Sequence, residues 1–278
     1  METREMRSWE EFEETFRKLE SERADLESGR SPFYVSPFLF RGQSSSTWKL
    51  ETTLERYLPN AVRPRVRGYY RKMFAAKPQI EAGTEHRWEI PTLEEFSTVL
   101  EAQESPTLPG LPGYEFWVYL RHLRFPSPLL DWSRSPYVAA FFAFNGAGNQ
   151  PHPPEAVAIF AYLEYAGRAK RHNPRAPYIA TTGPYVRSHM RHVLQQSDYS
   201  ICLVRDNDEW RFESHESALS ASGQQESLWK FTIPAAERAK VLCMLDRFNL
   251  NAFSLFGSDE GLVESVANRE LMFKGEDL

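Results

Sequence analysis

The stretch FLFRGQSSSTWKL, residues 38–50, contains an apolar run typical of a β-strand, followed directly by an arginine and a glycine. A glutamine, four small hydroxyl residues and a tryptophan come next. Two interpretations fit this pattern. The hydroxyl residues can form a polar turn after the strand. Alternatively, Arg41 and Gly42 can bind an anion, because a guanidinium and an exposed backbone suit a phosphate or carboxylate. The choice depends on the rest of the chain.

The bulk composition indicates an ordinary globular protein. The chain has 278 residues, 41% hydrophobic and 26% charged, and is long enough for a sizeable core. Its formal net charge of -5 argues against binding nucleic acid through overall charge. Cys202 and Cys243 lie in apolar runs and favour reduced core thiols. No signal-peptide pattern and no apolar run of membrane-spanning length is present, so we expect a cytoplasmic protein.

The apolar periodicity predicts an α+β fold, with helices dominant in the first half and strands in the second. Strands are predicted at AVAIFAYLEY, YSICLV and LWKFTI. Helices are predicted at TLEEFSTVLEAQ and YEFWVYLRHLR, and after Ser135, Pro234 and Ser258. We expect one mixed domain over residues 31–278, preceded by an N-terminal amphipathic helix within residues 1–30.

That first helix is predicted from the helical spacing of Trp9, Phe12, Phe16 and Leu19. Two interpretations remain open for it. The apolar face can pack on the helix's own domain, or it can dock a partner protein.

A basic segment, PNAVRPRVRGYYRKMFAAK, spans residues 59–77. Cations interleaved with aromatic rings can hold phosphates and stack bases, which predicts a nucleic-acid contact. The residues predicted for it are Arg63, Arg65, Arg67, Tyr69 and Arg71. The same pattern also fits the solvated face of a helix.

A second polar island, LLDWS, places Asp131 at the end of an apolar run, followed by Trp132 and Ser133. A carboxylate in such surroundings is usually paired or hydrogen-bonded, because burying it alone is costly. It can cap a turn or serve a site. The sequence contains no P-loop, Rossmann or nucleophile-elbow motif and no convincing metal-ligand spacing. We therefore expect no metal.

Four stretches in order resemble the FRG domain, a family named for a Phe/Tyr-Arg-Gly triplet. FRGQSSSTWKLETTLERY is similar to its opening motif, and RHLRFPSPLLDWSRSPYVAAFFAF is similar to its central motif. In the second stretch, Arg124 and Pro128 stand where the family has glycine and arginine. RHVLQQSDYSI and LFGSDEGLVE resemble two later segments, with Ser197 replacing glycine and Gly257 replacing proline. The resemblance runs from about residue 38 to residue 267.

FRG domains in turn distantly resemble ADP-ribosyltransferases, which implies a core with a split β-sheet and NAD as co-substrate. In those enzymes an arginine at the end of an early strand binds NAD, a role that Arg41 fits. A polar motif on a second strand precedes a helix of alanines and aromatics, as Asp131, Trp132 and Ser133 precede VAAFFAF. A third strand carries a catalytic carboxylate, where this chain offers Gln195 and Gln196.

The resemblance implies a set of site residues. Candidates for catalysis are Arg41, Asp131, Gln195 and Glu260, although the place of Glu260 in the first turn of a predicted helix is also explained by the helix dipole. Candidates for contact with NAD are Arg41, Gly42, Gln43, Trp48, His122, Trp132, Ser133 and Tyr137. We expect Arg41 and Asp131 to share one cleft, with Trp48 or Trp132 as a wall.

The leading functional hypothesis is an NAD-dependent mono-ADP-ribosyltransferase of toxin or anti-phage defence type. Its acceptor would be single-stranded RNA or DNA, or a protein, and a neutralising antitoxin protein is a possible partner. The alternatives are a non-catalytic module that binds a nucleotide or nucleic acid, and an NAD glycohydrolase.

Overall fold

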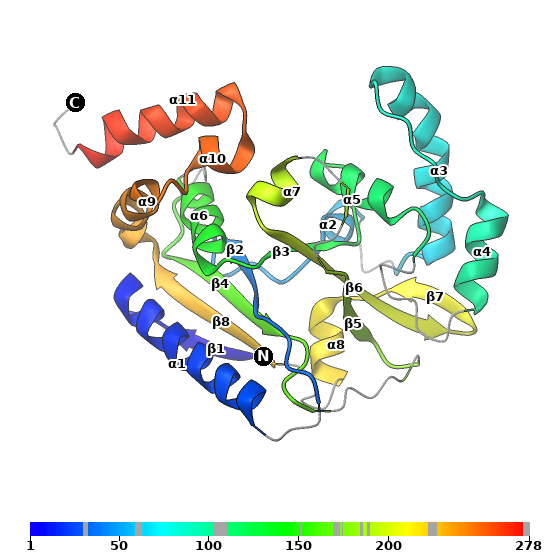
Figure 1. Cartoon of the computed structure of the whole chain (residues 1–278), viewed down its shortest axis with the longest axis horizontal. Helices are drawn as coiled ribbons and strands as arrows, with labels where there is room; N and C mark the ends of the chain where they lie inside the picture. The colour runs from blue at the N-terminus through cyan, green and yellow to red at the C-terminus, as the bar shows by residue number, and fades with distance from the viewer. Residues whose placement is uncertain are drawn as a thin grey trace.

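The computed structural model describes residues 1–29, 33–58, 63–102, 111–148, 150, 152–168, 173, 175–183, 186–187, 190–221 and 227–274. Within these residues, eight strands form one mixed sheet in the order β1-β8-β4-β2-β3-β6-β5, and β7 also pairs with β6 (Figure 1). The strands are β1 Glu2–Glu5, β2 Leu39–Gln43, β3 Leu130–Ser133, β4 Ala156–Leu163, β5 Tyr178–Thr181, β6 Ser197–Asp206, β7 Glu209–Phe212 and β8 Ser227–Pro234. β1 is parallel to β8, and the other pairs are antiparallel.

Helices pack against this sheet. They are α1 Trp9–Ser28, α2 Thr53–Tyr57, α3 Val66–Gly83, α4 Leu93–Ala102, α5 Tyr114–His122, α6 Pro136–Ala147, α7 Met190–Leu194, α8 His215–Ala221, α9 Arg238–Arg247, α10 Ala252–Phe256 and α11 Asp259–Ala267, with a 3-10 helix η2 Ala235–Glu237 and a π-helix η3 Asn268–Phe273. This mixture confirms the predicted α+β class. No helix in the described part of the chain combines the length and apolar character that crossing a bilayer requires.

The predicted helix starts agree with the structure. The Ser135 and Ser258 side chains accept hydrogen bonds from the N–H groups of Val138 and Gly261, and so cap α6 and α11. Thr92 and Glu95 form a reciprocal capping pair at the start of α4. Short polar side chains at these positions satisfy N–H groups that the first helical turn leaves unpaired.

The sheet divides between β2 and β3. These two strands share one residue pair, Phe40 with Ser133, whereas β2 pairs with β4 from Leu39 to Gln43. Beyond that pair, the facing strand edges need other hydrogen-bond partners. Arg41 supplies one of them, because its Nη1 donates to the main-chain oxygen of Asp131 at 2.8 Å. A side chain thus continues the contact where the backbone ladder stops.

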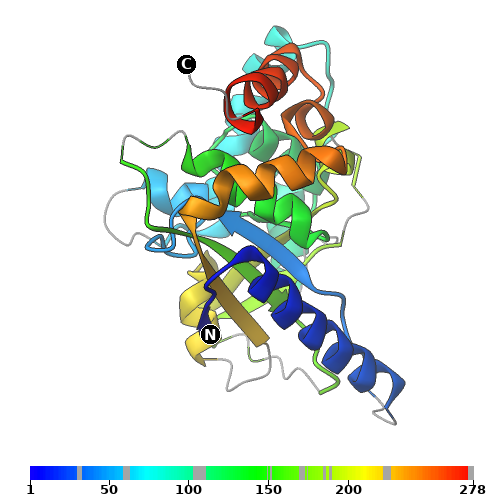
Figure 2. The same ribbon diagram turned by 90° about the vertical axis from the view of Figure 1, so that its left-hand side faces the viewer.

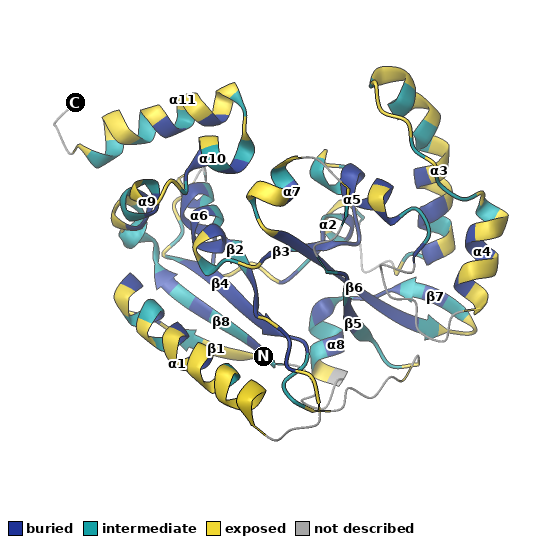
Figure 3. Cartoon of the chain, viewed as in Figure 1, coloured by how far each residue is buried: buried dark blue, intermediate teal, exposed yellow. Residues whose placement is uncertain are grey.

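The N-terminal segment belongs to the core of the same domain. Trp9, Phe12, Phe16 and Leu19 are all buried in one cluster with α6, α9 and the strands β2, β4 and β8. Residues 2–5 form β1 at the sheet edge, a strand that the sequence analysis did not predict. Figure 2 shows α1 lying along the sheet, with its last turns extending past it, and Figure 3 shows those turns exposed. The helix that was predicted as a separate segment within residues 1–30 is therefore packed into the core of the domain that follows it.

Two further clusters fill the rest of the interior. One joins α3, α4 and α5 to β6 and β7 around Tyr70 and Trp117, which are fully buried. The other lies between the strands and α8 and includes Leu39, Trp132 and Cys202. Neither cysteine forms a disulfide within the described residues; Cys202 is buried and Cys243 half-buried.

β2 and α6 approach each other unusually closely. A Cβ added at Gly42 would lie 1.8 Å from the main-chain oxygen of Ala139 and 2.8 Å from the nitrogen of Ala143. From the helix side, a Cβ at Gly146 would lie 2.1 Å from Ser44 Oγ. The glycine of the FRG triplet is therefore required for the packing of a strand against a helix. Its predicted role, letting the backbone approach a ligand, remains a prediction.

Candidate functional site

A polar cleft opens where the sheet divides. It encloses a cavity of about 270 Å³. Its lining residues are Phe40, Arg41, Gly42, His122, Asp131, Trp132, Ser133, Ala139, Phe142, Gln195 and Ser197. Arg41 and Asp131, 90 positions apart in the chain, meet here. The prediction that they share one cleft is confirmed, with Trp132 as a wall.

Arg41 brings a desolvated cation to this cleft. The residue keeps partial exposure, but burial of the guanidinium lowers the pKa of Arg41 to about 10, partly offset by Asp131 and reinforced by the cation of Arg121. It remains charged at neutral pH. Its Nε is buried and has no hydrogen-bond partner within the described residues. A buried donor of this kind is costly unless something accepts from it.

Asp131 supplies the only carboxylate among the residues that line this cavity. Its Oδ2 accepts a hydrogen bond from Nη2 of Arg121, a residue of the preceding helix α5. The two side chains form an ion pair. Its Oδ1 is buried and has no partner in the described part of the chain. Two residues that line the cleft therefore carry unsatisfied polar atoms, a donor on Arg41 and an acceptor on Asp131.

His122 enters the cleft from the end of α5 and is held by a buried hydrogen-bond chain. Its Nε2 lies 2.6 Å from the hydroxyl of Tyr199, and Nδ1 of His192 lies 2.9 Å from the same hydroxyl. Since a phenol can donate one hydrogen bond and accept another, the chain connects the two imidazoles in a fixed orientation.

Ser133 and Gln195 line the cleft but also maintain its shape. Ser133 Oγ donates to the main-chain oxygen of Gln195 at 2.9 Å, and the Gln195 amide donates to the oxygen of Leu255 at 3.1 Å. These bonds tie the turn after α7 to β3 and α10. The Gln195 amide nitrogen is therefore already engaged in the structure.

The Trp132 ring is positioned by a second buried network. Its indole N–H donates to Ser200 Oγ at 2.7 Å, and that hydroxyl lies 2.8 Å from Nε2 of His215. Because an indole is only a donor, the Ser200 hydroxyl accepts from Trp132, and its contact with His215 Nε2 completes the network. Trp132 also stacks on Tyr162 at 5.4 Å between ring centroids.

Several predicted NAD contacts lie outside the cleft. Gln43 is buried and donates to the main-chain oxygen of Lys49, which closes the turn after β2. Trp48 is exposed in that turn, and Tyr137 faces α1, where it hydrogen-bonds Glu13. Gln43, Trp48 and Tyr137 therefore do not line this cleft, and their predicted contact with NAD stays a prediction. The hydroxyl residues after Arg41 form the polar turn.

Glu260 also lies away from the cleft. It is exposed in the first turn of α11. Its pKa is lowered, first by the hydrogen bond from its own main-chain N–H and then by Ser258. The helix-terminus explanation accounts for its position, and no geometry supports its predicted catalytic role.

The basic segment before and within α3 does not present the predicted stacking surface. Tyr69 is buried and its hydroxyl donates to the main-chain oxygen of Pro126, while Tyr70 stacks on Phe96 inside the core. The prediction that bases stack on either ring is therefore wrong. Arg63 and Arg65 form ion pairs with Glu213 and Glu209.

Sequence reasoning missed several residues that build the cleft. Arg121, Tyr199, Ser200 and His215 were not predicted as site residues, although Arg121 begins the central motif and is spaced ten positions from Asp131. Ser200 and His215 reach the site only through the folding of β6 and α8. No local pattern marks them.

The fold and the cleft define an α+β protein with a ligand-sized cavity at a divided sheet. The family model of the FRG domain matches residues 36–151, so this part of the chain is similar to that family. The match contains Arg41, Asp131 and α6 but ends before β4, so the likeness of the two later stretches stays a prediction. Comparison with curated proteins and with solved structures gives no match.

One departure from the family pattern has a structural cost. Arg124, where the family has glycine, adopts the left-handed conformation with φ of 68°. A side chain in that region costs about 1–2 kcal/mol, part of which glycine recovers despite its greater chain entropy. We expect Arg124→Gly to raise the free energy of unfolding by about 0.5–1 kcal/mol, measured by urea denaturation. Since Arg124 is exposed, a clear loss of stability would contradict this explanation.

Proposed function

We propose that the cleft binds NAD and that the protein transfers ADP-ribose from it to an acceptor. The observation that supports this most is the pairing of a buried, unpartnered donor on Arg41 with a buried, unpartnered acceptor on Asp131 in one cavity. Such groups are stabilised when a ligand satisfies them. A cation suits the pyrophosphate, and a carboxylate suits a ribose hydroxyl or the cationic sugar.

The reaction would break the bond between the nicotinamide nitrogen and ribose C1′, with the electron pair leaving on nicotinamide. The acceptor's nucleophilic atom then forms the new bond to C1′ and loses its proton. Asp131 would stabilise the positive charge that develops on the sugar, as carboxylates do in glycoside hydrolysis. The cavity of about 270 Å³ suits one end of the dinucleotide, with the remainder across its mouth.

The test is incubation of the purified protein with labelled NAD and cell lysate, following both label transfer and nicotinamide release. We expect Arg41→Ala to reduce both by at least about 100-fold, because removing one desolvated charged contact at a reacting centre typically costs that much. Arg247→Ala, an exposed arginine on α9, is the matched control and should behave as the unaltered protein. Absence of transfer and release, or equal activity in Arg41→Ala, would refute the proposal.

A second candidate is a module that binds a nucleotide without turnover. It is favoured by the ion pair of Asp131 with Arg121, which leaves the cleft's only lining carboxylate partly neutralised. This candidate predicts NAD binding by calorimetry with no nicotinamide released. Release with free ADP-ribose as the sole product would instead identify an NAD glycohydrolase.

The proposed transferase would act as a toxin or in defence against phage, with a neutralising protein as its partner. Inducible expression tests this: we expect growth arrest with the unaltered chain and none with Arg41→Ala. Offering labelled NAD to purified RNA, single-stranded DNA and total protein separately would identify the acceptor class.

A further inference from the structure

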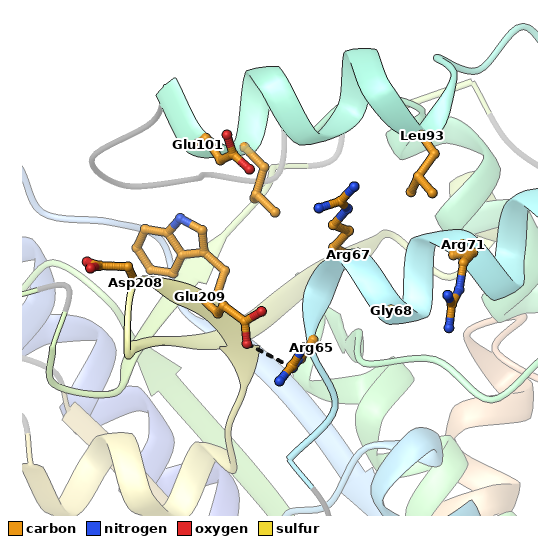
Figure 4. A pocket seen from close by; sticks show the side chains of 10 residues that line it. Arg65, Arg67, Gly68, Arg71, Leu93, Glu101, Asp208 and Glu209 are labelled. Atoms are coloured by element: carbon orange, nitrogen blue, oxygen red, sulfur yellow. Dashed lines mark ion pairs between the residues drawn. The ribbon is translucent and has the colours of Figure 1, made fainter.

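A second cavity lies away from the Arg41 cleft, between α3, α4 and the turn that joins β6 to β7. It encloses about 340 Å³ and shares no lining residue with the Arg41 cleft. Its walls are Arg65, Arg67, Gly68, Arg71, Leu93, Leu100, Glu101, Asp208, Glu209 and Trp210. Figure 4 shows Arg67 between the two helices, with Arg65 directed to Glu209 instead.

The charges around this cavity are unequally engaged. Arg65 forms an ion pair with Glu209 at 2.8 Å, and Asp208 is paired with Arg205. Within the described residues, Arg67 and Arg71 have no ion pair or side-chain hydrogen bond, and Glu101 has none either. Two cations against one carboxylate therefore remain available to a ligand, which favours an anion.

The N-terminus of α3 adds donors at the same place. Arg65 occupies the N-cap position but makes no capping hydrogen bond, so the N–H groups of Arg67 and Gly68 have no side-chain acceptor in the described part of the chain. An uncapped helix N-terminus attracts anions through these N–H groups and the helix dipole. Gly68 leaves that backbone accessible, because a Cβ added there would meet only Arg65 Cβ, at 3.7 Å.

Trp210 provides an independent indication of a ligand. Its side chain lines the cavity, it is only 4% exposed, and its indole N–H is buried without an acceptor among the described residues. Buried indole N–H groups usually find a partner. Thus the cavity combines two guanidinium groups, main-chain N–H groups and an indole N–H, all donors, beside the apolar walls of Leu93 and Leu100.

We propose that this cavity is a second binding site, for the phosphate group of a small molecule whose ring or apolar part contacts Leu93 and Leu100. The phosphate would accept from Arg67, from the N-terminus of α3 and from Trp210, with Arg71 as a second cation. A pocket of this size takes one phosphorylated molecule. It does not resemble a groove that follows a nucleic-acid strand, because Tyr69 and Tyr70 are buried.

The test uses the indole resonances of the full-length ¹⁵N-labelled protein, with the Trp210 signal assigned by its loss in Trp210→Phe. AMP, inorganic phosphate and adenosine are the probes. We expect AMP to shift the Trp210 resonance saturably, inorganic phosphate to do so more weakly, and adenosine to have no effect. Arg67→Ala should weaken AMP binding about tenfold, since a charged hydrogen bond to phosphate is lost.

Three variants make the result specific. Lys72→Ala, an exposed cation on the same helix that does not line the cavity, should leave the affinity unchanged. Glu101→Gln should tighten binding about threefold, because it removes the one unpaired carboxylate. Arg41→Ala should have no effect, which separates this site from the proposed NAD cleft. No shift at millimolar AMP, or equal binding by Arg67→Ala, would overturn the proposal, and tighter binding of a single-stranded oligonucleotide than of AMP would assign the surface to nucleic acid instead.

Discussion

Gly42→Ala is expected to destabilise the protein by at least about 4 kcal/mol, near the upper limit for single substitutions, or to prevent folding altogether. The added methyl group would lie 1.8 Å from the main-chain oxygen of Ala139. Neither partner can move away easily, because β2 is hydrogen-bonded to β4 along its whole length and the obstructing atoms belong to the backbone of α6. To relieve this overlap, α6 would have to move away from the sheet. That movement would disrupt the packing of the core around Phe40.

The matched control is Gly83→Ala at the end of α3, where an added Cβ meets nothing within 4 Å. That change should stabilise the protein slightly, by up to about 1 kcal/mol, because alanine has the higher helix propensity. Urea unfolding followed by circular dichroism measures both variants. A Gly42→Ala protein within 1 kcal/mol of the unaltered one would show that β2 and α6 do not pack as closely as described.

The second large effect is a loss of stability in acid that depends on His215. Complete burial, with a smaller contribution from the nearby cation of Arg41, lowers the pKa of His215 from its ordinary 6.5 to about 3. Between those values the unfolded chain binds a proton that the folded protein does not. Stability is therefore retained above pH 6.5 and lost as the pH falls toward 3, at up to about 1.4 kcal/mol per pH unit from this group.

Other groups titrate in the same range. Burial raises the pKa of Asp198 and of Glu55, for example, which gives contributions of opposite sign. The informative quantity is therefore the difference between the unaltered protein and His215→Gln, whose amide oxygen can still accept from Ser200. We expect the variant's stability to fall less steeply between pH 6 and pH 4, by roughly 1 kcal/mol per unit. Parallel stability curves would mean that His215 becomes protonated in the folded protein.

The elements that the sequence predicted correctly are those with a local cause. Ser135 and Pro136 mark the start of α6, and the long apolar run of β4 marks a strand with neighbours on both sides. β1 was missed because ETRE has no apolar periodicity and is a strand only through its pairing with β8. β7 was missed for the same reason: its register is set by β6.

The residues of the site also separate into those that the sequence predicted and those that it did not. Arg41 and Asp131 were predicted because each follows an apolar run and is polar where the chain would otherwise be buried. Trp48 and Tyr137 have the right chemistry near the right motifs, but the turn after β2 and the first turn of α6 direct them elsewhere. Arg121 and His215 act through Asp131 and Ser200, which lie on other elements of the fold. Such relations depend on strand order, which local spacing does not contain.

The Phe-Arg-Gly triplet of this chain combines two different kinds of constraint. Phe40 packs against Phe16 in the core, and Gly42 admits the backbone of α6, so both residues serve the architecture. Only Arg41 offers chemistry to a ligand. A descendant that had lost the proposed activity would still need the phenylalanine and the glycine to fold. Possession of the signature therefore identifies the scaffold, and the distinction between a working enzyme and a degenerate copy has to be sought at Arg41 and at the residues facing it across the divided sheet.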